Sequence, residues 1–492
     1  MNQPIRRVAL FCFLLIASLL VSSNYLQVVN ADSYKARNGN LRNIYDAFAY
    51  PRGQILTADG TVIAQSAPSG GILYKYQRQY PLKSAYANVT GYKSINYGAT
   101  DIESILDGYL KGTDSSESVA NFMDTLTGKS KKGGDVQLTL QNSVQQVAIK
   151  ALGTKVGSVV ALDPTTGAIL AMYSNPSFDP NGIASNDNDT SSAAGKVLEA
   201  DKNKPNLNHA TGENYPPGSV FKIVTAAAAL ESGKFTETGD TGGPQGALTW
   251  PGSSTQLINE NNESCRGTDL KTALAQSCNS IYGYVADKVG APTMAEYAQK
   301  FGFNNPGLKI PLTVAQSNFP SAASLGSDSV ALAQDSVGQN GTQVTPLQAA
   351  MIAAAVANGG VIMQPYLVDK ETAPNGHVTY KGSDHQHELS QAMQPATAAT
   401  LDDMMQNVVA NGTAAPDAVP NVQMGAKTGT AQQGDKNNPL AWFVCYGTAN
   451  GKKVAVAVMI KTSDPNLRDN ISGASYAGPV AAAVLKAALG VK

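Results

Sequence analysis

Three short motifs follow one another along this chain, and together they could transfer an acyl group through a serine. A Ser-x-x-Lys motif occupies residues 219–222, Ser-Cys-Asn follows at 277–279, and Lys-Thr-Gly-Thr at 427–430. They supply a hydroxyl nucleophile, an amine that could be its base, and further hydroxyl, amide and ammonium groups. Alone, each motif has a simpler explanation: an exposed polar pair, a helix cap and a turn at a strand end. Only the ordered set predicts a serine acyl-transfer site.

The nucleophile is predicted to lie at the start of a helix. Proline and glycine at 216–218 end the preceding segment, and the alanine-rich run 220–230 is typical of a buried helix. Free N–H groups and the helix dipole at that end favour negative charge on the Ser219 oxygen. Residues three apart share one helical face, so Lys222 can reach Ser219, and burial would lower the pKa of its amine. A neutral Lys222 could then accept the serine proton.

With these motifs the chain resembles the class B penicillin-binding proteins, most closely the short actinobacterial type called penicillin-binding protein A. The resemblance covers nearly the whole chain. Residues 50–64 are similar to the family's N-terminal signature, 97–103 to a second pedestal motif, and 338–360 to a stretch between the second and third catalytic motifs. Val220, His209 and Asp101 depart from the usual Thr, Arg and Gly, but none of these changes removes a reactive group.

The resemblance implies a monofunctional peptidoglycan D,D-transpeptidase that β-lactam antibiotics also acylate. Ser219 would attack the carbonyl between two D-alanines of a stem peptide while Lys222 takes its proton. Asn279 would hold Lys222 and the substrate amide. The backbone N–H groups of Ser219 and Thr430 would form the oxyanion hole. The acyl-enzyme would then react with the amine of a neighbouring stem peptide, which cross-links the cell wall.

The remaining site residues would serve the leaving group and the carboxylate. Ser277 would relay a proton to the departing D-alanine, Lys427 would supply positive potential, and the Thr428 and Thr430 hydroxyls would bind the terminal carboxylate. Thr428, Gly429 and Thr430 would form a strand edge to which an extended peptide can add. The resemblance implies no cofactor and no metal. A separate glycosyltransferase would be the partner, because the region before the catalytic motifs is too short for a polymerase domain.

Other functions share this chemistry. A β-lactamase would hydrolyse the acyl-enzyme quickly, but rarely carries an anchored pedestal, and a D,D-carboxypeptidase would release the product to water. A β-lactam sensor or a cell-wall synthesis scaffold needs no turnover, and the complete set of reactive residues disfavours the scaffold. A Ser-His-Asp triad would have to use His209. His385 and His387 could suggest a metal site, but no third ligand lies nearby in the sequence.

The segments around the motifs predict an α+β fold. Alternating or apolar strands are expected at 136–140, 159–162, 168–172, 441–446 and 454–460, and helices at 144–152, 220–230, 270–288, 346–357 and 479–489. Strands at both ends of the catalytic region with helices between them imply one antiparallel sheet covered by helices. The resemblance implies the same architecture, the penicillin-recognising serine transferase fold.

The composition and the N-terminal segment indicate which partners are disfavoured and how the chain divides into domains. The chain has 492 residues and a net charge of −1 with 15% charged residues, which disfavours nucleic-acid binding. Arg6 and Arg7 precede an apolar run that extends with polar breaks to residue 29, and no convincing cleavage site follows, so a membrane anchor is favoured over a signal peptide. The arginines favour a cytoplasmic N-terminus. We expect an anchor at 1–30, a pedestal similar to the family's dimerisation domain at 31–150, and a transpeptidase domain at 151–492.

The cysteines leave one question open. Cys265 and Cys278 could form a disulfide in an oxidising compartment or remain two buried thiols, and the sequence does not decide between these. A bridge would stiffen the loop that carries Ser277 and Asn279. Cys445 is expected to be a core residue of a strand.

Overall fold

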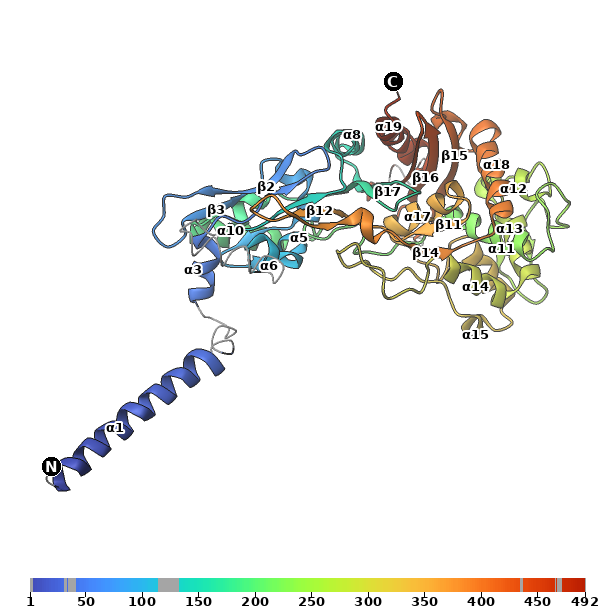
Figure 1. Ribbon diagram of the computed structural model, residues 1–492. Coiled ribbons are helices and arrows are strands. Elements are labelled where there is room, and N and C mark those ends of the chain that lie inside the picture. Colours follow the sequence, from blue (N-terminus) through green and yellow to red (C-terminus); the bar gives the residue numbers. More distant parts are fainter. Residues whose placement is uncertain are drawn as a thin grey trace.

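The computed structural model describes residues 3–30, 33, 41–113, 132–433, 437–464, 466 and 471–491. An N-terminal helix precedes an elongated body (Figure 1). The end of the body near this helix is a small part that we call the pedestal, built mainly from residues 41–113 and 132–138. The other end is a larger part that we call the catalytic part, which contains a five-stranded sheet and most of the helices.

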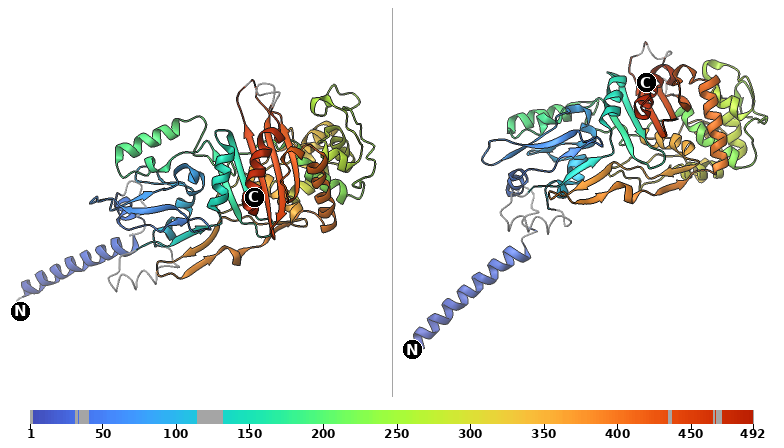
Figure 2. Two further views of the ribbon diagram at one scale, coloured as in Figure 1. Left: turned by 90° about the horizontal axis from the view of Figure 1, so that it is seen from above. Right: turned by 45° about the horizontal axis from the view of Figure 1, so that its top comes forward.

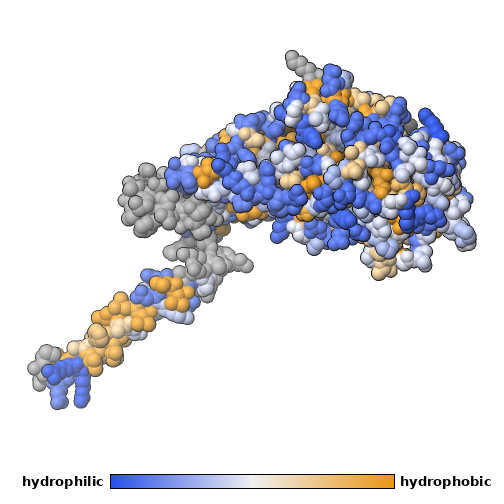
Figure 3. Space-filling model, turned by 45° about the vertical axis from the view of Figure 1, so that its right-hand side comes forward, coloured by the Kyte–Doolittle hydropathy of each residue, from blue (hydrophilic) through white to orange (hydrophobic). Residues whose placement is uncertain are grey.

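The N-terminal helix is apolar and projects from the body. Helix α1 (Gln3–Asn24) continues through a π-helical turn (Tyr25–Val29), giving 27 residues, and none of its side chains is buried. Figure 3 shows apolar side chains along most of its length and a hydrophilic tip. At about 1.5 Å per residue the helix exceeds the roughly 30 Å hydrocarbon core of a bilayer. Within the described residues it is the one helix with the length and composition of a membrane span.

The pedestal is built on a six-stranded sheet in the order β13-β12-β6-β1-β2-β3. Strand β1 pairs in parallel with β6, and the other pairs are antiparallel. The strands are β1 (Ile55–Leu56), β2 (Val62–Pro68), β3 (Tyr76–Gln79), β6 (Asp135–Leu138), β12 (Val368–Thr372) and β13 (Val378–Lys381). Smaller elements complete it: α3 (Leu41–Ala49), η2 (Lys83–Ala85), α4 (Ala87–Thr90), β4 (Lys93–Ser94), β5 (Gly98–Ala99), α5 (Asp101–Ile105) and α6 (Asp107–Leu110).

A charged cluster lies inside the pedestal and explains part of the N-terminal signature. Arg52 donates to Glu103 at 2.9 Å and to Asp107 at 2.7 Å, while Arg78 donates to the other oxygen of Glu103. Glu103 is completely buried. Burial alone would raise the pKa of Glu103, but Arg78 and Arg52 outweigh it and lower the pKa. Glu103 is therefore a carboxylate held between two arginines.

The catalytic part contains the antiparallel sheet that the sequence predicts. Five strands lie in the order β15-β16-β17-β7-β8, all paired antiparallel, so the first and last segments of this part meet in the sheet. The strands predicted at 159–162, 168–172, 441–446 and 454–460 are confirmed. The strands are β7 (Val156–Leu162), β8 (Ile169–Asn175), β15 (Gln423–Ala431), β16 (Leu440–Ala449) and β17 (Lys452–Lys461).

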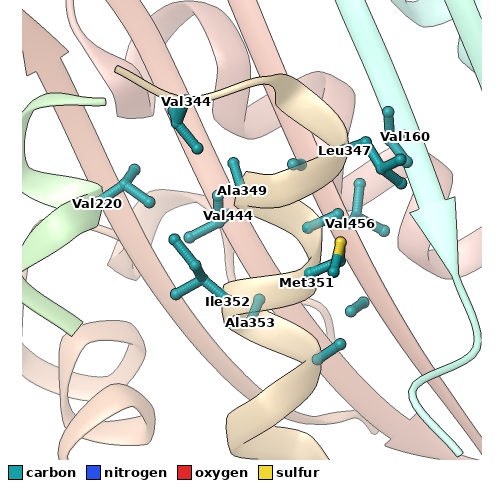
Figure 4. Close-up of a cluster of buried hydrophobic side chains, with 14 of the residues drawn as sticks. Val160, Val220, Val344, Leu347, Ala349, Met351, Ile352, Ala353, Val444 and Val456 are labelled. Carbon is teal, nitrogen blue, oxygen red and sulfur yellow. The ribbon is translucent and has the colours of Figure 1, made fainter. Parts of the chain in front are cut away.

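Helices cover both faces of this sheet (Figure 2). Helices α8 (Asn142–Leu152) and α19 (Gly478–Leu489) pack together on one face, and α17 (Pro346–Ala357) packs on the other. In Figure 4, Leu347, Met351 and Ile352 of α17 lie beside Val160 and Val444 of the strands. Every residue of α17 except Ala357 is buried, so this helix is the centre of the core. The helices predicted at 144–152, 346–357 and 479–489 are confirmed.

A helical lobe lies beside the sheet and carries the first two motifs. Its principal helices are α11 (Lys222–Glu231), α12 (Leu270–Ala275), α13 (Asn279–Val289), α14 (Ala291–Lys300), α15 (Ala322–Leu325), α16 (Ser329–Ser336) and α18 (Pro395–Asn411). Helices α9 (Pro180–Ile183) and α10 (Asn188–Ala200) pack against the pedestal. The other elements after β8 are β9 (Leu248–Thr249), β10 (Gln256–Leu257), β11 (Val361–Met363), β14 (Glu388–Gln391), and the short turns η3 (Gly218–Phe221), η4 (Glu260–Asn262), η5 (Gly382–His385), η6 (Ala415–Asp417) and η8 (Gly473–Ala477).

Two features differ from the sequence-based expectation. The single helix expected at 270–288 is two helices, interrupted at residues 276–278. The chain also crosses between the two parts. Strands β12 and β13 extend the pedestal sheet, although they lie inside the segment expected to be the transpeptidase domain. Helix α8 packs on the catalytic sheet, although most of it lies inside the segment expected to be the pedestal. The division at residue 150 stays a prediction, and residue 31, its other boundary, lies outside the described residues.

Candidate active site

The nucleophile turn is fixed from several sides. Ser219 lies in the turn Gly218–Phe221, and the α-helix begins at Lys222, slightly later than predicted. Gly218 has a positive φ of +53°, and its N–H donates to the Gly338 carbonyl at 2.9 Å. A Cβ on Gly338 would lie 2.1 Å from the Gly218 oxygen, so only glycine fits there. The Trp442 indole donates to the Pro216 carbonyl at 3.0 Å and ties the same turn to β16.

Lys222 connects the first motif to the second. Its Nζ donates to Ser219 Oγ at 3.0 Å, to the Ser277 carbonyl at 2.5 Å and to Asn279 Oδ1 at 2.7 Å. The side chain is completely buried. Burial lowers the pKa of Lys222 well below its usual value, and the nearby Lys427 amine lowers it further. The negative charge of Glu260 acts in the opposite direction and raises this pKa. The predicted contact between the hydroxyl and the buried amine is therefore present, and burial favours the neutral form of that amine.

Ser277 lies between two buried amines. Its Oγ is 3.3 Å from Lys222 Nζ and accepts from Lys427 Nζ at 2.9 Å. Burial lowers the pKa of Lys427 to about 7, although the negative charge of Glu260 raises it in part. The backbone of Ser277 has φ +62°, a conformation that a residue other than glycine adopts only when its surroundings enforce it. This turn interrupts the helix expected at 270–288 and points the hydroxyl into the site.

Asn279 joins this turn to a segment that the sequence analysis did not single out. Its backbone N–H donates to Asn259 Oδ1 and its side-chain amide to the Ile258 carbonyl, both at 2.8 Å. Cys265 and Cys278 form a disulfide between the same two segments, with Cα atoms 6.1 Å apart, which settles the alternative left open above. We call residues 256–266 the cleft wall. Cys445 is buried in β16, as predicted.

The third motif forms the opposite side on the edge strand β15. Thr428, Gly429 and Thr430 pair with β16 on one side only, which leaves the other edge toward the cleft. A Cβ on Gly429 would lie 3.0 Å from the Pro217 carbonyl, so this glycine lets the strand approach the nucleophile turn. Thr413, another residue absent from the prediction, shares a hydrogen bond of 2.6 Å with the Thr428 hydroxyl.

A cavity of about 940 Å³ lies between these sides. Five of the eight predicted site residues line it, namely Ser219, Ser277, Asn279, Thr428 and Thr430. The other three, Lys222, Lys427 and Gly429, are buried behind that surface and contact it as described above. All eight predicted residues therefore meet at one site.

The structure also places residues that the motifs do not name. Glu260 lines the cavity, and its charge acts on both buried lysines. No local signal identifies it, because its role depends on the fold bringing the wall to the motifs. His209 instead pairs with Glu213 at 2.8 Å and Tyr215 at 3.2 Å, so the triad alternative finds no support in the described contacts of Ser219.

Comparison with known proteins places this site in a family. Residues 157–489 match the family described as penicillin binding protein transpeptidase domain, and residues 52–136 match the penicillin binding protein A dimerisation domain. The chain is 38% identical over 501 residues to the peptidoglycan D,D-transpeptidase PbpA of Mycolicibacterium smegmatis, and 36% identical to PbpA of Mycobacterium tuberculosis, covering 99% of the chain and 99% of the relative in both cases.

Solved structures of penicillin-binding proteins resemble the structure of this chain. The ceftriaxone acyl-enzyme of penicillin-binding protein A from M. tuberculosis superposes with a TM-score of 0.83 at 34% identity, covering 90% of this chain and 100% of that chain. The D,D-transpeptidase domain of a peptidoglycan glycosyltransferase from Eggerthella lenta gives a TM-score of 0.75 at 32% identity, covering 90% and 98%.

The fold and the site define a serine acyl-transferase of the penicillin-recognising kind. The hydroxyl, the buried amine and the threonine-bearing strand edge meet in one cleft of an antiparallel sheet covered by helices. The chain belongs to the penicillin-binding protein transpeptidase family, in its class B, and is a serine-type D,D-transpeptidase.

Proposed function

We propose that this chain cross-links peptidoglycan stem peptides through an acyl-enzyme on Ser219. The observation that carries the proposal is the hydrogen bond of 3.0 Å between Ser219 Oγ and the completely buried Lys222 amine, whose pKa is lowered. A neutral amine at that distance can accept the serine proton during attack. The mycobacterial relatives named peptidoglycan D,D-transpeptidases support the choice of substrate.

In the first half-reaction, Ser219 Oγ attacks the carbonyl between the two D-alanines, and its proton moves to Lys222. Asn279 keeps the Lys222 amine in place through its hydrogen bond of 2.7 Å. The backbone N–H groups of Ser219 and Thr430 stabilise the oxyanion, and losing one such donor typically costs about 10²–10³ in rate.

The leaving D-alanine needs a proton and a carboxylate anchor. Ser277 passes the proton to the departing amine, because its hydroxyl contacts both Lys222 and Lys427. Lys427 supplies positive potential, and the hydroxyls of Thr428 and Thr430 bind the carboxylate from the edge of β15, beside which the peptide extends as an added strand. An amine of a second stem peptide then takes the acyl group.

The test is to incubate the full chain with labelled penicillin and follow the adduct by mass spectrometry. We expect a long-lived adduct on Ser219 that is absent from Ser219→Ala. The acyl-enzyme structures of the M. tuberculosis relative with penicillin G and imipenem support this expectation. Rapid turnover would indicate a β-lactamase instead. Cross-linking restored in cells by Ser219→Ala would indicate a scaffold.

The position in the cell follows from the anchor. We propose one membrane span at 1–30 with the N-terminus cytoplasmic, because Arg6 and Arg7 precede the apolar helix. The two segments predicted as domains, 31–150 and 151–492, would then both lie outside. A separate membrane glycosyltransferase would supply the glycan strands. A phosphatase reporter fused after residue 491 should be active only outside the membrane, so its inactivity would contradict this orientation.

A further inference from the structure

Glu260 gives the catalytic cleft a charge that the proposed reaction does not use. It lines the cavity of about 940 Å³ together with Ser219, and no other lining residue that the structure describes is charged. The rest of the lining is apolar or carries hydroxyl and amide groups. Lys222 and Lys427 lie buried behind this surface. A ligand in the cleft therefore meets one exposed charge, and that charge is negative.

The backbone of the cleft wall holds this carboxylate at the cavity. Asn259, the preceding residue, donates from its side chain to the carbonyls of Gln245 and Glu263, each at 3.0 Å. The Glu263 N–H donates to the Glu260 carbonyl at 3.1 Å. The Glu260 carboxylate itself is exposed and belongs to no ion pair among the described residues. A positioned charge without a counter-ion can act on whatever occupies the cavity.

The contacts of Asn279 indicate which part of a ligand lies beside Glu260. Asn279 is proposed to hold the substrate amide, and it bonds to Ile258 and Asn259, the two residues before Glu260. The group attached to that substrate amide on the side away from the reacting carbonyl therefore lies toward the same wall. In a penicillin this group is the α-carbon of the acylamino side chain. In a stem peptide it is the residue that precedes the two D-alanines.

The field of Glu260 extends across the site. Its negative charge raises the pKa of both Lys222 and Lys427, which lie behind the lining that carries Ser219. A charged ligand group inside the cavity experiences the same field. Such a group is attracted if it is positive and repelled if it is negative, and the effect is largest for the part of the ligand that lies toward the wall.

We propose that Glu260 selects acyl donors by charge: beside the amide that Asn279 holds, a cationic group is favoured over a neutral one, and a neutral group over an anionic one. The inference rests on the proposed function, because it concerns the donor that acylates Ser219. For stem peptides it favours an ammonium or an amide over a carboxylate on the residue before the D-alanines. Glu260 determines specificity here and takes no part in making or breaking bonds.

Three penicillins of nearly the same shape test the inference on the full chain. Penicillin G is uncharged at its side-chain α-carbon, whereas ampicillin carries an ammonium there and carbenicillin a carboxylate. Acylation of Ser219 is measured at about pH 6.5, where an α-amino group is still charged, and each rate is divided by the penicillin G rate. In Glu260→Gln the carbenicillin ratio should rise and the ampicillin ratio should fall, each by about 1.5- to 5-fold, the range of an exposed charge pair.

Two controls separate charge selection from other effects. Division by the penicillin G rate removes any change common to all three compounds, including a shift in the pKa of Lys222. Glu263→Gln changes an exposed acid on the same wall but outside the lining of the Ser219 cavity, and should leave both ratios unchanged. In the wild type, about 1 M salt shortens the screening length to about 3 Å. Salt should therefore move both ratios in the same directions as Glu260→Gln, a measurement that needs no variant to fold.

The outcomes distinguish this inference from the proposed function. Ratios that stay unchanged in Glu260→Gln, or that change equally in Glu263→Gln, would overturn the inference. So would two ratios that move in the same direction, since a change in shape rather than charge would explain them, or wild-type ratios that do not respond to salt. A wild-type chain that none of the three penicillins acylates on Ser219 would contradict the proposed function itself.

Discussion

Lys222 is the side chain on which the proposed chemistry depends most. Replacing it by Met keeps an apolar side chain of similar length but removes the base. We expect the rate of penicillin acylation to fall by about 10²–10⁴-fold, the usual contribution of a positioned general base. The melting temperature should change little, because removal of the desolvated amine is offset by the loss of its hydrogen bonds to the Ser277 carbonyl and Asn279 Oδ1. Acylation near the wild-type rate would assign the base to another group.

Glu260 gives a pH test of the same amine. Its negative charge raises the pKa of Lys222 and Lys427 against their burial. In the proposed mechanism Lys222 is a neutral base, so the acylation rate should rise as pH rises through its pKa. Glu260→Gln removes the charge and should lower that pKa, which moves the acidic limb of the pH–rate profile to lower pH.

Penicillin acylation rates measured over a wide pH range would show the shift. Glu263→Gln is the matched control, since Glu263 lies on the same wall but does not act on the pKa of either lysine. An acidic limb that stays in place in Glu260→Gln would show that Lys222 does not set the profile.

The contact between Ser219 and Lys222 could be predicted from the sequence because helical geometry is local. The spacing of Ser219 and Lys222 is sufficient to expect their contact, and the 3.0 Å distance confirms it. Neither Glu260 nor Thr413 was predicted, because each reaches the site only through contacts between distant segments. The pairing of Cys265 with Cys278 was undecided for the same reason, since the separation of two cysteines in sequence does not give the distance between their Cα atoms.

At the scale of the elements, the disulfide fastens the cleft wall to the turn that carries Ser277. The bond closes a loop of 13 residues. By chain entropy, its loss should cost about 3 kcal/mol of unfolding free energy. We expect the double variant Cys265→Ala, Cys278→Ala to melt at a lower temperature and to acylate more slowly, because Asn279 depends on the wall through its contacts with Ile258 and Asn259.

Differential scanning calorimetry and penicillin acylation would measure the two effects. Cys12→Ala is the control, because this cysteine is exposed on α1, away from the body. Unchanged stability and acylation in the double variant would show that the hydrogen bonds of Asn259 and Asn279 suffice to hold the wall.

The broken helix shows where pattern-based prediction of elements ends. The apolar pattern at 270–288 is continuous enough to predict one helix, yet Ser277 adopts φ +62° and divides it into α12 and α13. The break is favoured by tertiary contacts, including the disulfide at Cys278 and the two lysines that hold the Ser277 hydroxyl. Helical propensity is a weak preference that such contacts override. The predicted strands show no such conflict, because their burial and their pattern agree.

For the whole molecule, the main unpredicted feature is that one sheet is shared between the two parts. The strands β12 and β13 belong to the chain of the catalytic part but complete the pedestal sheet next to β6. Pairing between residues about 368 and 138 is too distant in sequence for any local pattern to indicate it. Because the strands cross over, unfolding of the pedestal should disturb the catalytic part as well.

The charged cluster of the pedestal offers a way to test this coupling. Glu103→Ala leaves Arg52 and Arg78 buried without their shared carboxylate, which typically costs about 3–5 kcal/mol of unfolding free energy. If the parts unfold together, calorimetry should show one transition at lower temperature, and penicillin acylation should be lost at that same temperature. Glu296→Ala, which breaks the exposed pair with Lys300, is the control and should cost about 1 kcal/mol or less.

The pH dependence of the stability lost in Glu103→Ala identifies the cause of that loss. The folded-state pKa of Glu103 is lowered, so its contribution is complete above the unfolded-state pKa of about 4.3 and is lost as pH falls through the lower folded-state value. The gap in stability between wild type and Glu103→Ala should therefore be full at neutral pH and shrink in acid. Two separate transitions, with the one that abolishes acylation unshifted, would show that the crossover strands do not couple the parts. A gap independent of pH would mean that packing, rather than the carboxylate between two arginines, stabilises the pedestal.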